Sequence, residues 1–319
     1  FRRTRARPGH GQRLGRPPPG RYPGQSFFSI QRETMSFILL AAQRSGTAYL
    51  TSILNAHPSL HVFPEVLLPE LAPCGFYAYW RARIGDDPAA ILPTAREACV
   101  REYLGALLDP AQIHRFYPGA DGAATHIGVN LKYDAFERDC PSLRKGAQAA
   151  WLEYPVLHLI RRNTLRRICS GRLNQRKALL GRRSHDTAKA PPVAIELPIG
   201  QPLLDELALR ESIVEDAREH LRANPRVLEI AYEDFFEPGV SESARIRPAL
   251  LERILAFIGL PLPSEPMETA LVKTNPSDLR ALIKNYEAVE ATLEGTPYAR
   301  HLDDAHAPAH AHRSEERRV

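Results

Sequence analysis

Short apolar runs and amphipathic stretches alternate along the chain from residue 35 onward. The apolar runs predict buried β-strands at residues 37–42, 126–133, 155–160 and 227–232. Between and after these runs, apolar residues recur at helical spacing and predict helices at residues 48–56, 95–108, 165–173, 203–221, 250–259 and 276–293. Strands that alternate with helices in this way predict an α/β protein, with a central parallel sheet between two helical layers (three-layer α/β/α).

The pattern also predicts where ligands bind. No internal repeat or break in composition interrupts residues 35–300, so we expect a single domain there. In open parallel sheets, ligands bind outside the carboxyl ends of the strands. Polar clusters follow three of the predicted strands, at residues 43–47, 161–170 and 232–234. We therefore expect these clusters to gather at one edge of the sheet.

Arg44, Ser45, Gly46 and Thr47 form the first cluster, between a predicted strand and a predicted helix. A turn of small residues in this position aims backbone N–H groups at one point, where the helix dipole favours an anion. The Arg44 guanidinium and the Thr47 hydroxyl add further donors. A helix N-terminus that Ser45 or Thr47 merely caps fits the same residues equally well. The Gly-Lys-Ser/Thr sequence of P-loop kinases and NTPases is absent, which disfavours those enzymes.

Further candidates each have an ordinary structural alternative. A carboxylate with apolar neighbours, such as Glu65, suits a general base, although most glutamates in loops are simply solvated. Arg162 and Ser170, eight residues apart, could hold one phosphate from two sides, or mark a charged helix start. Lys132 in an apolar strand must reach solvent or a site at the sheet edge. Tyr232 could stack on a base, or be a half-buried tyrosine at a strand end.

Together these motifs resemble the sulfotransferases that use 3′-phosphoadenosine 5′-phosphosulfate (PAPS). In that family an (R/K)SGT loop follows the first strand, and an arginine followed eight residues later by a serine holds the 3′-phosphate. The carbohydrate and tyrosylprotein branches are similar further along, with a leucine, a His-Pro pair and a glutamate as general base. The matching residues span roughly 37 to 262 and are Arg44–Thr47, Leu50, His57-Pro58, Glu65, Arg162, Ser170 and Tyr232-Glu233-Asp234.

The resemblance implies a P-loop NTPase-like sulfotransferase fold and PAPS as donor, with no metal ion. It implies that Glu65 is the general base and that Arg44 and Lys132 neutralise the leaving oxygen. The donor-binding residues would be Arg44, Ser45, Gly46, Thr47, Arg162, Ser170 and Tyr232, the last near the adenine. The acceptor would be a hydroxyl or amine of a carbohydrate-like or natural-product molecule, or a protein tyrosine. A non-catalytic protein that binds adenosine bisphosphate or another polyanion is the alternative from a different class.

The chain departs from the family pattern at specific positions. Ala48 stands where a second threonine is common, so one hydroxyl donor to the phosphosulfate is lost. The R-K-G-x-x-G segment that closes over the 3′-phosphate in cytosolic members is absent, and Lys273 or the basic loop at residues 172–189 could replace it. The strand around Asn130 lacks the catalytic histidine of the cytosolic small-molecule members.

Charge is unevenly distributed along the chain. The whole sequence carries a net charge of +5, but residues 1–34 hold eight arginines and one glutamate, which leaves −2 for residues 35–319. The pI of about 9.1 therefore reflects a Pro- and Gly-rich tail that cannot pack a core, and we expect no nucleic-acid partner. We expect residues 1–34 to be a disordered tail upstream of a native start at Met35. A genuine basic arm that binds acidic partners is the alternative.

The remaining features suit a cytoplasmic protein. Four widely spaced cysteines, without a CxxC pair, predict neither a disulfide framework nor a zinc site. The longest apolar run near the start has six residues, too few for a signal peptide or a membrane span. We expect residues 301–319, rich in His, Ala and Arg, to form a disordered C-terminal tail.

Overall fold

The computed structural model describes residues 35–68, 75–86, 92–109, 112, 125–135, 154–179, 194–237, 245–271 and 278–303. The chain divides into two units, Phe1–Arg32 and Glu33–Val319, and every described residue lies in the second. The predicted N-terminal tail, Lys273 and most of the predicted C-terminal tail lie outside the described residues. In the parts of the chain that are described, no helix is both long and apolar enough to cross a membrane.

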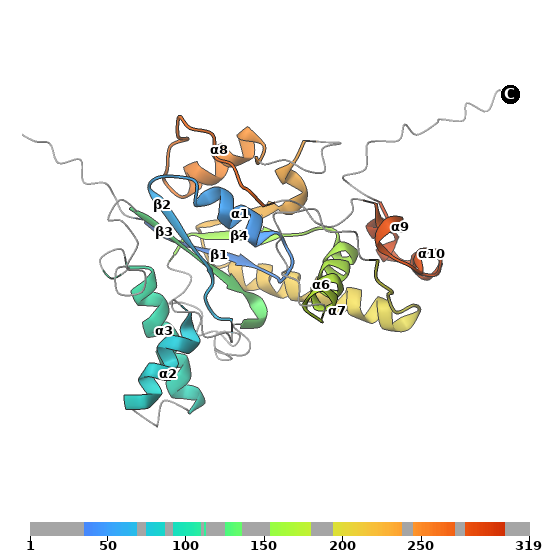
Figure 1. Ribbon diagram of the computed structural model, residues 1–319, viewed down its shortest axis with the longest axis horizontal. Coiled ribbons are helices and arrows are strands. Elements are labelled where there is room, and N and C mark those ends of the chain that lie inside the picture. Colours follow the sequence, from blue (N-terminus) through green and yellow to red (C-terminus); the bar gives the residue numbers. More distant parts are fainter. Residues whose placement is uncertain are drawn as a thin grey trace, which may run out of the picture. The chain divides into compact units, whose positions relative to one another are not determined.

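A five-stranded parallel sheet forms the centre of the described structure (Figure 1), which confirms the predicted fold class. The strand order is β2-β3-β1-β4-β5, so the first strand lies in the middle. The loop that leaves this strand therefore emerges at the centre of the carboxyl edge. The strands are β1 (Met35–Ala41), β2 (Leu60–Glu65), β3 (His126–Lys132), β4 (Val156–Ile160) and β5 (Val227–Ala231).

Helices cover both faces of the sheet. The α-helices are α1 (Thr47–Leu54), α2 (Phe76–Asp86), α3 (Pro93–Leu107), α6 (Thr164–Leu179), α7 (Gln201–Leu221), α8 (Pro248–Phe257), α9 (Leu279–Leu282) and α10 (Tyr286–Leu293). Short 3₁₀ helices η4 (Tyr232–Phe235) and η5 (Pro297–His301) follow β5 and α10. Each of the six predicted helices thus has a counterpart in the structure.

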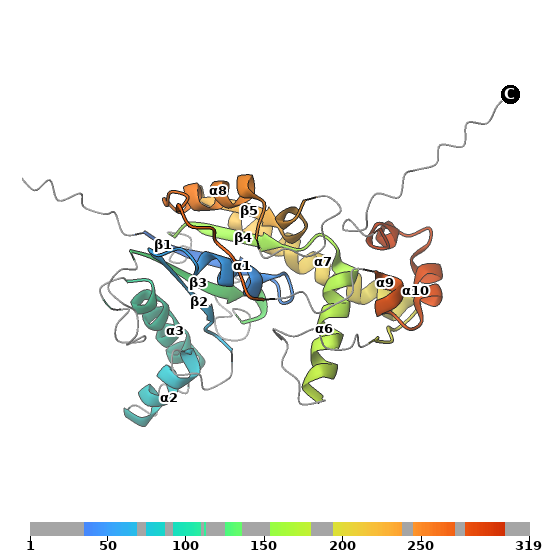
Figure 2. The same ribbon diagram turned by 45° about the horizontal axis from the view of Figure 1, so that its top comes forward.

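Alternating side chains of β1 separate the two halves of the core. Phe37 and Leu39 pack in one cluster with apolar residues of α1 and α8, whereas Ile38 packs with α3 on the opposite face. Figure 2 shows α1 and α8 over one face of the sheet and α3 over the other. Complete burial of such side chains contributes about 1.5–3 kcal/mol each, which holds the strand ends in a fixed register.

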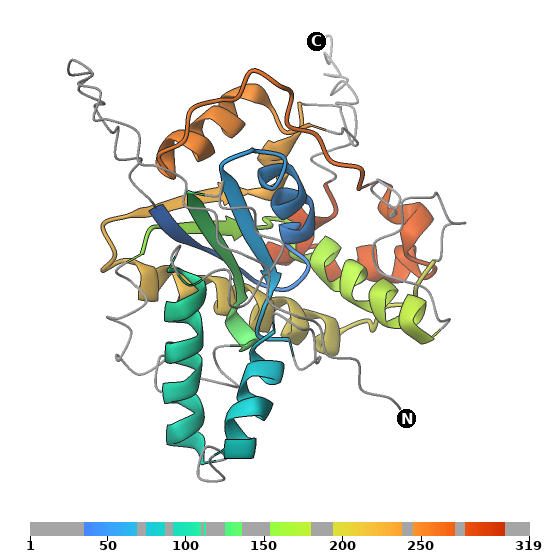
Figure 3. The same cartoon turned by 60° about the vertical axis from the view of Figure 1, so that its left-hand side comes forward.

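Two local features differ from the sequence prediction. Residues 60–65 form edge strand β2, where we expected a loop, and α2 was not predicted; α2 lies beside α3 (Figure 3). The predicted helix at 276–293 is divided between α9 and α10 in its described part. Ile283 leaves the helix because its segment pairs with Ile195, through Lys284 N–H and the Ile195 carbonyl at 2.7 Å. This backbone pairing outweighs the local helical preference.

Candidate active site

The loop between β1 and α1 has a backbone that only particular residues can adopt. Gly46 has φ 95°, and a Cβ atom there would lie 2.7 Å from Cε2 of Tyr232 and closer still to its Cδ2. Glycine is therefore required both by the left-handed backbone and by the tyrosine ring. Arg44 also has a positive φ of 65°, which is uncommon outside glycine and costs on the order of 1 kcal/mol.

The N-terminus of α1 lacks a side-chain cap. The N-cap residue is Gly46, which has no side chain and makes no side-chain cap hydrogen bond. The Ser45 hydroxyl is buried and has no hydrogen-bond partner among the described residues. The structure thus disagrees with the simple capping interpretation of this sequence. It leaves one buried hydroxyl without a partner among the described residues, at a helix N-terminus where the sequence predicts an anion.

Lys132 connects this loop to Glu65. Its Nζ donates to Thr47 Oγ1 at 2.5 Å and lies 3.3 Å from Glu65 Oε1. The lysine side chain is 3% exposed and that of Glu65 is 30% exposed. Burial lowers the pKa of Lys132, and the charge of Glu65 and its hydrogen bond oppose that shift. Three predicted site residues from three elements are therefore in direct contact.

Pro64 explains how Glu65 reaches this position. Proline cannot donate a ladder hydrogen bond and is tolerated on an edge strand, and the register of β2 against β3 shifts between Phe63 and Glu65. Glu65 then pairs with Asn130, two residues before Lys132. Asn130 is buried and its Oδ1 has no partner among the described residues. The sequence pointed to this strand only for the histidine that it lacks, so the buried acceptor of Asn130 is a new feature of the site.

Two arginines lie beside the loop. Arg44 Nε donates to Ser170 Oγ at 3.1 Å, which links the loop to α6. Arg161, directly after β4, donates from Nη1 to the Arg44 carbonyl at 3.3 Å, and its guanidinium lies 4.8 Å from the centre of the Tyr232 ring. Burial lowers the pKa of Arg44; the charge of Glu65 raises it and that of Arg161 lowers it.

Arg162 is placed differently from its neighbour Arg161. Its guanidinium makes a bidentate pair with Asp234, at 2.8 and 2.7 Å, and its side chain is 57% exposed. The hydrogen bond that Arg162 donates to Asp234 raises the pKa of Arg162. Among the described residues, Ser170 contacts Arg44 and not Arg162, so the predicted arginine–serine pair is not in contact. The 3′-phosphate role of Arg162 and Ser170 stays a prediction.

Tyr232 is buried against the loop. It is 9% exposed, and its ring packs on Gly46, Phe235 and Phe236 below the Arg161 guanidinium. Its predicted contact with adenine stays a prediction. Arg161 begins the predicted cluster at residues 161–170, but the spacing to Ser170 selects Arg162 and carries no signal that would select Arg161.

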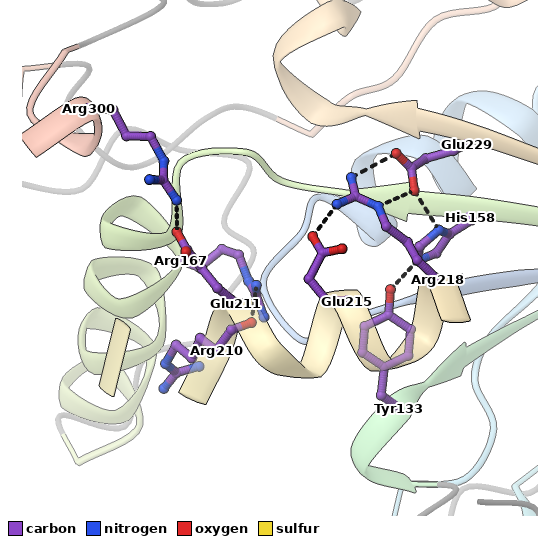
Figure 4. Close-up of polar contacts among 9 residues, drawn as sticks. All are labelled: Tyr133, His158, Arg167, Arg210, Glu211, Glu215, Arg218, Glu229 and Arg300. Carbon is purple, nitrogen blue, oxygen red and sulfur yellow. Dashed lines mark hydrogen bonds and ion pairs between the residues drawn. The ribbon is translucent and has the colours of Figure 1, made fainter. Parts of the chain in front are cut away.

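On the face of the sheet opposite α1, polar side chains connect the end of β3 to β4 across the strand between them, β1 (Figure 4). The Tyr133 hydroxyl bonds to His158 Nε2, and His158 Nδ1 lies 3.0 Å from Glu229 Oε2. Arg218 of α7 donates to both carboxylate oxygens of Glu229, each at 2.8 Å, beside a cavity of about 600 Å³. Because Tyr133 directly follows Lys132, this network anchors the strand end that carries the lysine.

Comparison with known proteins places the chain among bacterial relatives. No family model matches it. It is 24% identical over 271 residues to Nodulation protein H of Rhizobium meliloti (strain 1021), covering 84% of this chain and 94% of that protein. It is 26% identical over 281 residues to Nodulation protein H of Rhizobium tropici, covering 85% and 95%.

Solved structures with which it aligns include a sulfotransferase from Alicyclobacillus acidocaldarius, at 16% identity and a TM-score of 0.38, covering 84% of this chain and 94% of that one. The sulfotransferase domain of the Synechococcus PCC 7002 olefin synthase aligns at 20% identity and a TM-score of 0.35, covering 72% and 74%. No group of three or more His, Cys, Asp or Glu side chains that could hold a metal ion occurs within the described ranges. The chain is thus similar to Nodulation protein H over most of its length, and the motifs at its strand ends resemble those of the PAPS-dependent sulfotransferases.

Proposed function

We propose that this protein transfers a sulfuryl group from PAPS to a hydroxyl or amine of a carbohydrate-like or natural-product acceptor, and that it does so in the cytoplasm. One observation carries the proposal. The buried ammonium of Lys132 contacts both Thr47, at the start of the anion-binding helix, and Glu65, the candidate base. A single cation thus joins the group that would bind the donor to the group that would activate the acceptor.

The loop supplies the donors for the 5′-phosphosulfate. The N–H groups at the start of α1, the Ser45 hydroxyl and the Thr47 hydroxyl belong to the N-terminal end of the helix, where the helix dipole is positive. Such preorganised donors stabilise charge without reorganising during the reaction. Ser170, which accepts from Arg44, and Arg162 would hold the 3′-phosphate once a ligand releases Ser170 from Arg44.

The chemical step needs a base on one side of sulfur and positive charge on the other. Glu65 accepts the proton of the acceptor hydroxyl or amine while the acceptor oxygen or nitrogen forms a bond to sulfur. The bond between sulfur and the bridging oxygen breaks in line, and the oxygen keeps its electron pair. Lys132 and Arg44 neutralise the charge that grows on this oxygen, and burial of Lys132 strengthens that interaction.

The donor half of the proposal is tested by titration calorimetry with adenosine 3′,5′-bisphosphate. Binding by the wild type supports it, and the absence of binding would overturn it. A screen with radiolabelled PAPS against oligosaccharides, small natural-product alcohols and tyrosine peptides then identifies the acceptor. Tight bisphosphate binding without transfer to any acceptor would favour the non-catalytic binder, and transfer only to tyrosine peptides would favour a tyrosylprotein-type enzyme.

Glu65→Gln tests the base. We expect transfer to slow by about 10²-fold or more, because the amide cannot accept the proton, with bisphosphate affinity nearly unchanged. Glu206→Gln is the matched control, since Glu206 of α7 is a partly buried carboxylate paired with Arg172 of α6 and with Arg210 of its own helix. Full turnover by Glu65→Gln would exclude Glu65 as the base.

A further inference from the structure

Two guanidinium groups of like charge lie next to each other at the donor loop. Arg161 donates to the carbonyl of Arg44, and its charge lowers the pKa of Arg44. In the described ranges, neither arginine has a carboxylate within ion-pair distance; their partners are a hydroxyl, a carbonyl and an aromatic ring. Two cations held together without an acid favour an anion between or beside them.

Arg161 also has an unused donor. Its Nε is buried and bonds to no described residue. A buried N–H without a partner is unfavourable, and charged groups more so than neutral ones. The cation–π contact with Tyr232 fixes the guanidinium against the loop, so that an anion bound at the N-terminus of α1 lies within its reach.

Arg162 provides an internal comparison. The two arginines are adjacent in sequence, but Asp234 already neutralises the exposed guanidinium of Arg162. Arg161 is half-buried, donates to the loop carbonyl of Arg44 and has no carboxylate partner among the described residues. Arg161 and Arg162 therefore differ in both position and charge partner, and only Arg161 lies against the loop between β1 and α1.

We propose that Arg161 binds the 5′-phosphosulfate of the donor together with Arg44, and that Tyr232 positions Arg161 by carrying its guanidinium. This inference rests on the proposed function. It accounts for a loop that lacks both a lysine after its glycine and the second hydroxyl at Ala48. The additional arginine supplies the positive charge and N–H donors that these residues provide elsewhere.

The test separates the two phosphates of the ligand. Calorimetric or NMR titrations of wild type, Arg161→Gln and Arg162→Gln use adenosine 3′,5′-bisphosphate, adenosine 5′-monophosphate and adenosine 3′-monophosphate. For Arg161→Gln we expect about tenfold or greater weakening with the bisphosphate and the 5′-monophosphate, and no change with the 3′-monophosphate. Arg161→Lys should recover part of the loss, because it restores charge without the fork of donors.

Arg162→Gln is the matched control, with the opposite selectivity expected: weaker binding of the 3′-monophosphate and an unchanged 5′-monophosphate. Unchanged 5′-monophosphate affinity in a folded Arg161→Gln protein would overturn the inference while leaving the proposed function intact. Equal losses for both monophosphates would overturn it as well. A wild type that binds none of the three ligands would instead overturn the proposed function.

Discussion

Gly46→Ala is the sharpest test of the loop geometry. Alanine at φ 95° takes on the cost of the left-handed backbone, about 1–2 kcal/mol. Its methyl group also enters the Tyr232 ring, 2.7 Å from Cε2, so that the ring or the loop must move. Overpacking of this kind costs typically about 1–3 kcal/mol. We therefore expect a total loss of about 2–5 kcal/mol in the free energy of unfolding.

Chemical denaturation of both proteins measures this loss. Gly295→Ala is the control, since Gly295 has φ 72° and nothing within 4 Å of the added methyl group. The control should show only the backbone cost. Gly46→Ala/Tyr232→Leu should restore the steric part of the loss and leave the backbone part. A Gly46→Ala protein no less stable than Gly295→Ala would refute the reasoning.

Calorimetry gives a second readout of the same change. Because the displaced loop carries the N–H groups of the anion site, bisphosphate affinity should fall by about tenfold or more in Gly46→Ala and stay unchanged in Gly295→Ala. Unchanged affinity in Gly46→Ala would show that the loop does not bind the ligand.

Two further changes test the polar contacts. Lys132→Met should slow sulfuryl transfer by about 10²-fold or more, since it removes the cation beside Thr47, whereas bisphosphate binding should weaken much less. Equal losses in transfer and in binding would contradict the proposal that Lys132 neutralises charge on the leaving oxygen. The hydrogen bonds with His158 and Arg218 lower the pKa of Glu229 to about 2. The carboxylate therefore stabilises the folded protein at pH values above its unfolded pKa of about 4.5, and this contribution is lost as the pH falls toward 2. After a discount for the partial exposure of Glu229, this contribution is about 1–2 kcal/mol. In denaturant titrations, Glu229→Gln should flatten the dependence of the free energy of unfolding on pH between about 5 and 2. An unchanged dependence on pH would contradict the lowered pKa.

The fold could be predicted from sequence wherever apolar periodicity is strong. The buried strands around Leu39, Val129 and Leu157 have nearly continuous apolar runs, so their existence and parallel arrangement were predictable. The edge strand β2 was not, because it is short and contains Pro64, which usually argues against a strand. What makes it a strand is pairing with β3, a long-range contact that no local pattern contains.

The site was predictable in outline because strand ends of a parallel sheet meet at one edge. This predicted that residues 43–47 lie at that edge and that Lys132 could reach it, whereas Glu65 was assigned to the site by the family resemblance. In the structure, Lys132 contacts both Thr47 and Glu65. Which of two adjacent arginines faces the loop depends on the acidic turn after β5, which holds Arg162 through Asp234. That choice is made by charges distant in sequence, and spacing alone could not reveal it.

The hydrogen bond between Arg44 and Ser170 has a consequence for the order of events at the site. In the structure, Arg44 from one end of the proposed donor site donates a hydrogen bond to Ser170 from the other end. A phosphate that takes Ser170 frees Arg44, so filling one end makes the other easier to fill, and the coupling is reciprocal. Under the proposed function, the bisphosphate should bind more tightly than the summed binding free energies of the 3′- and 5′-monophosphates predict. Both phosphates should also dissociate together when the product leaves.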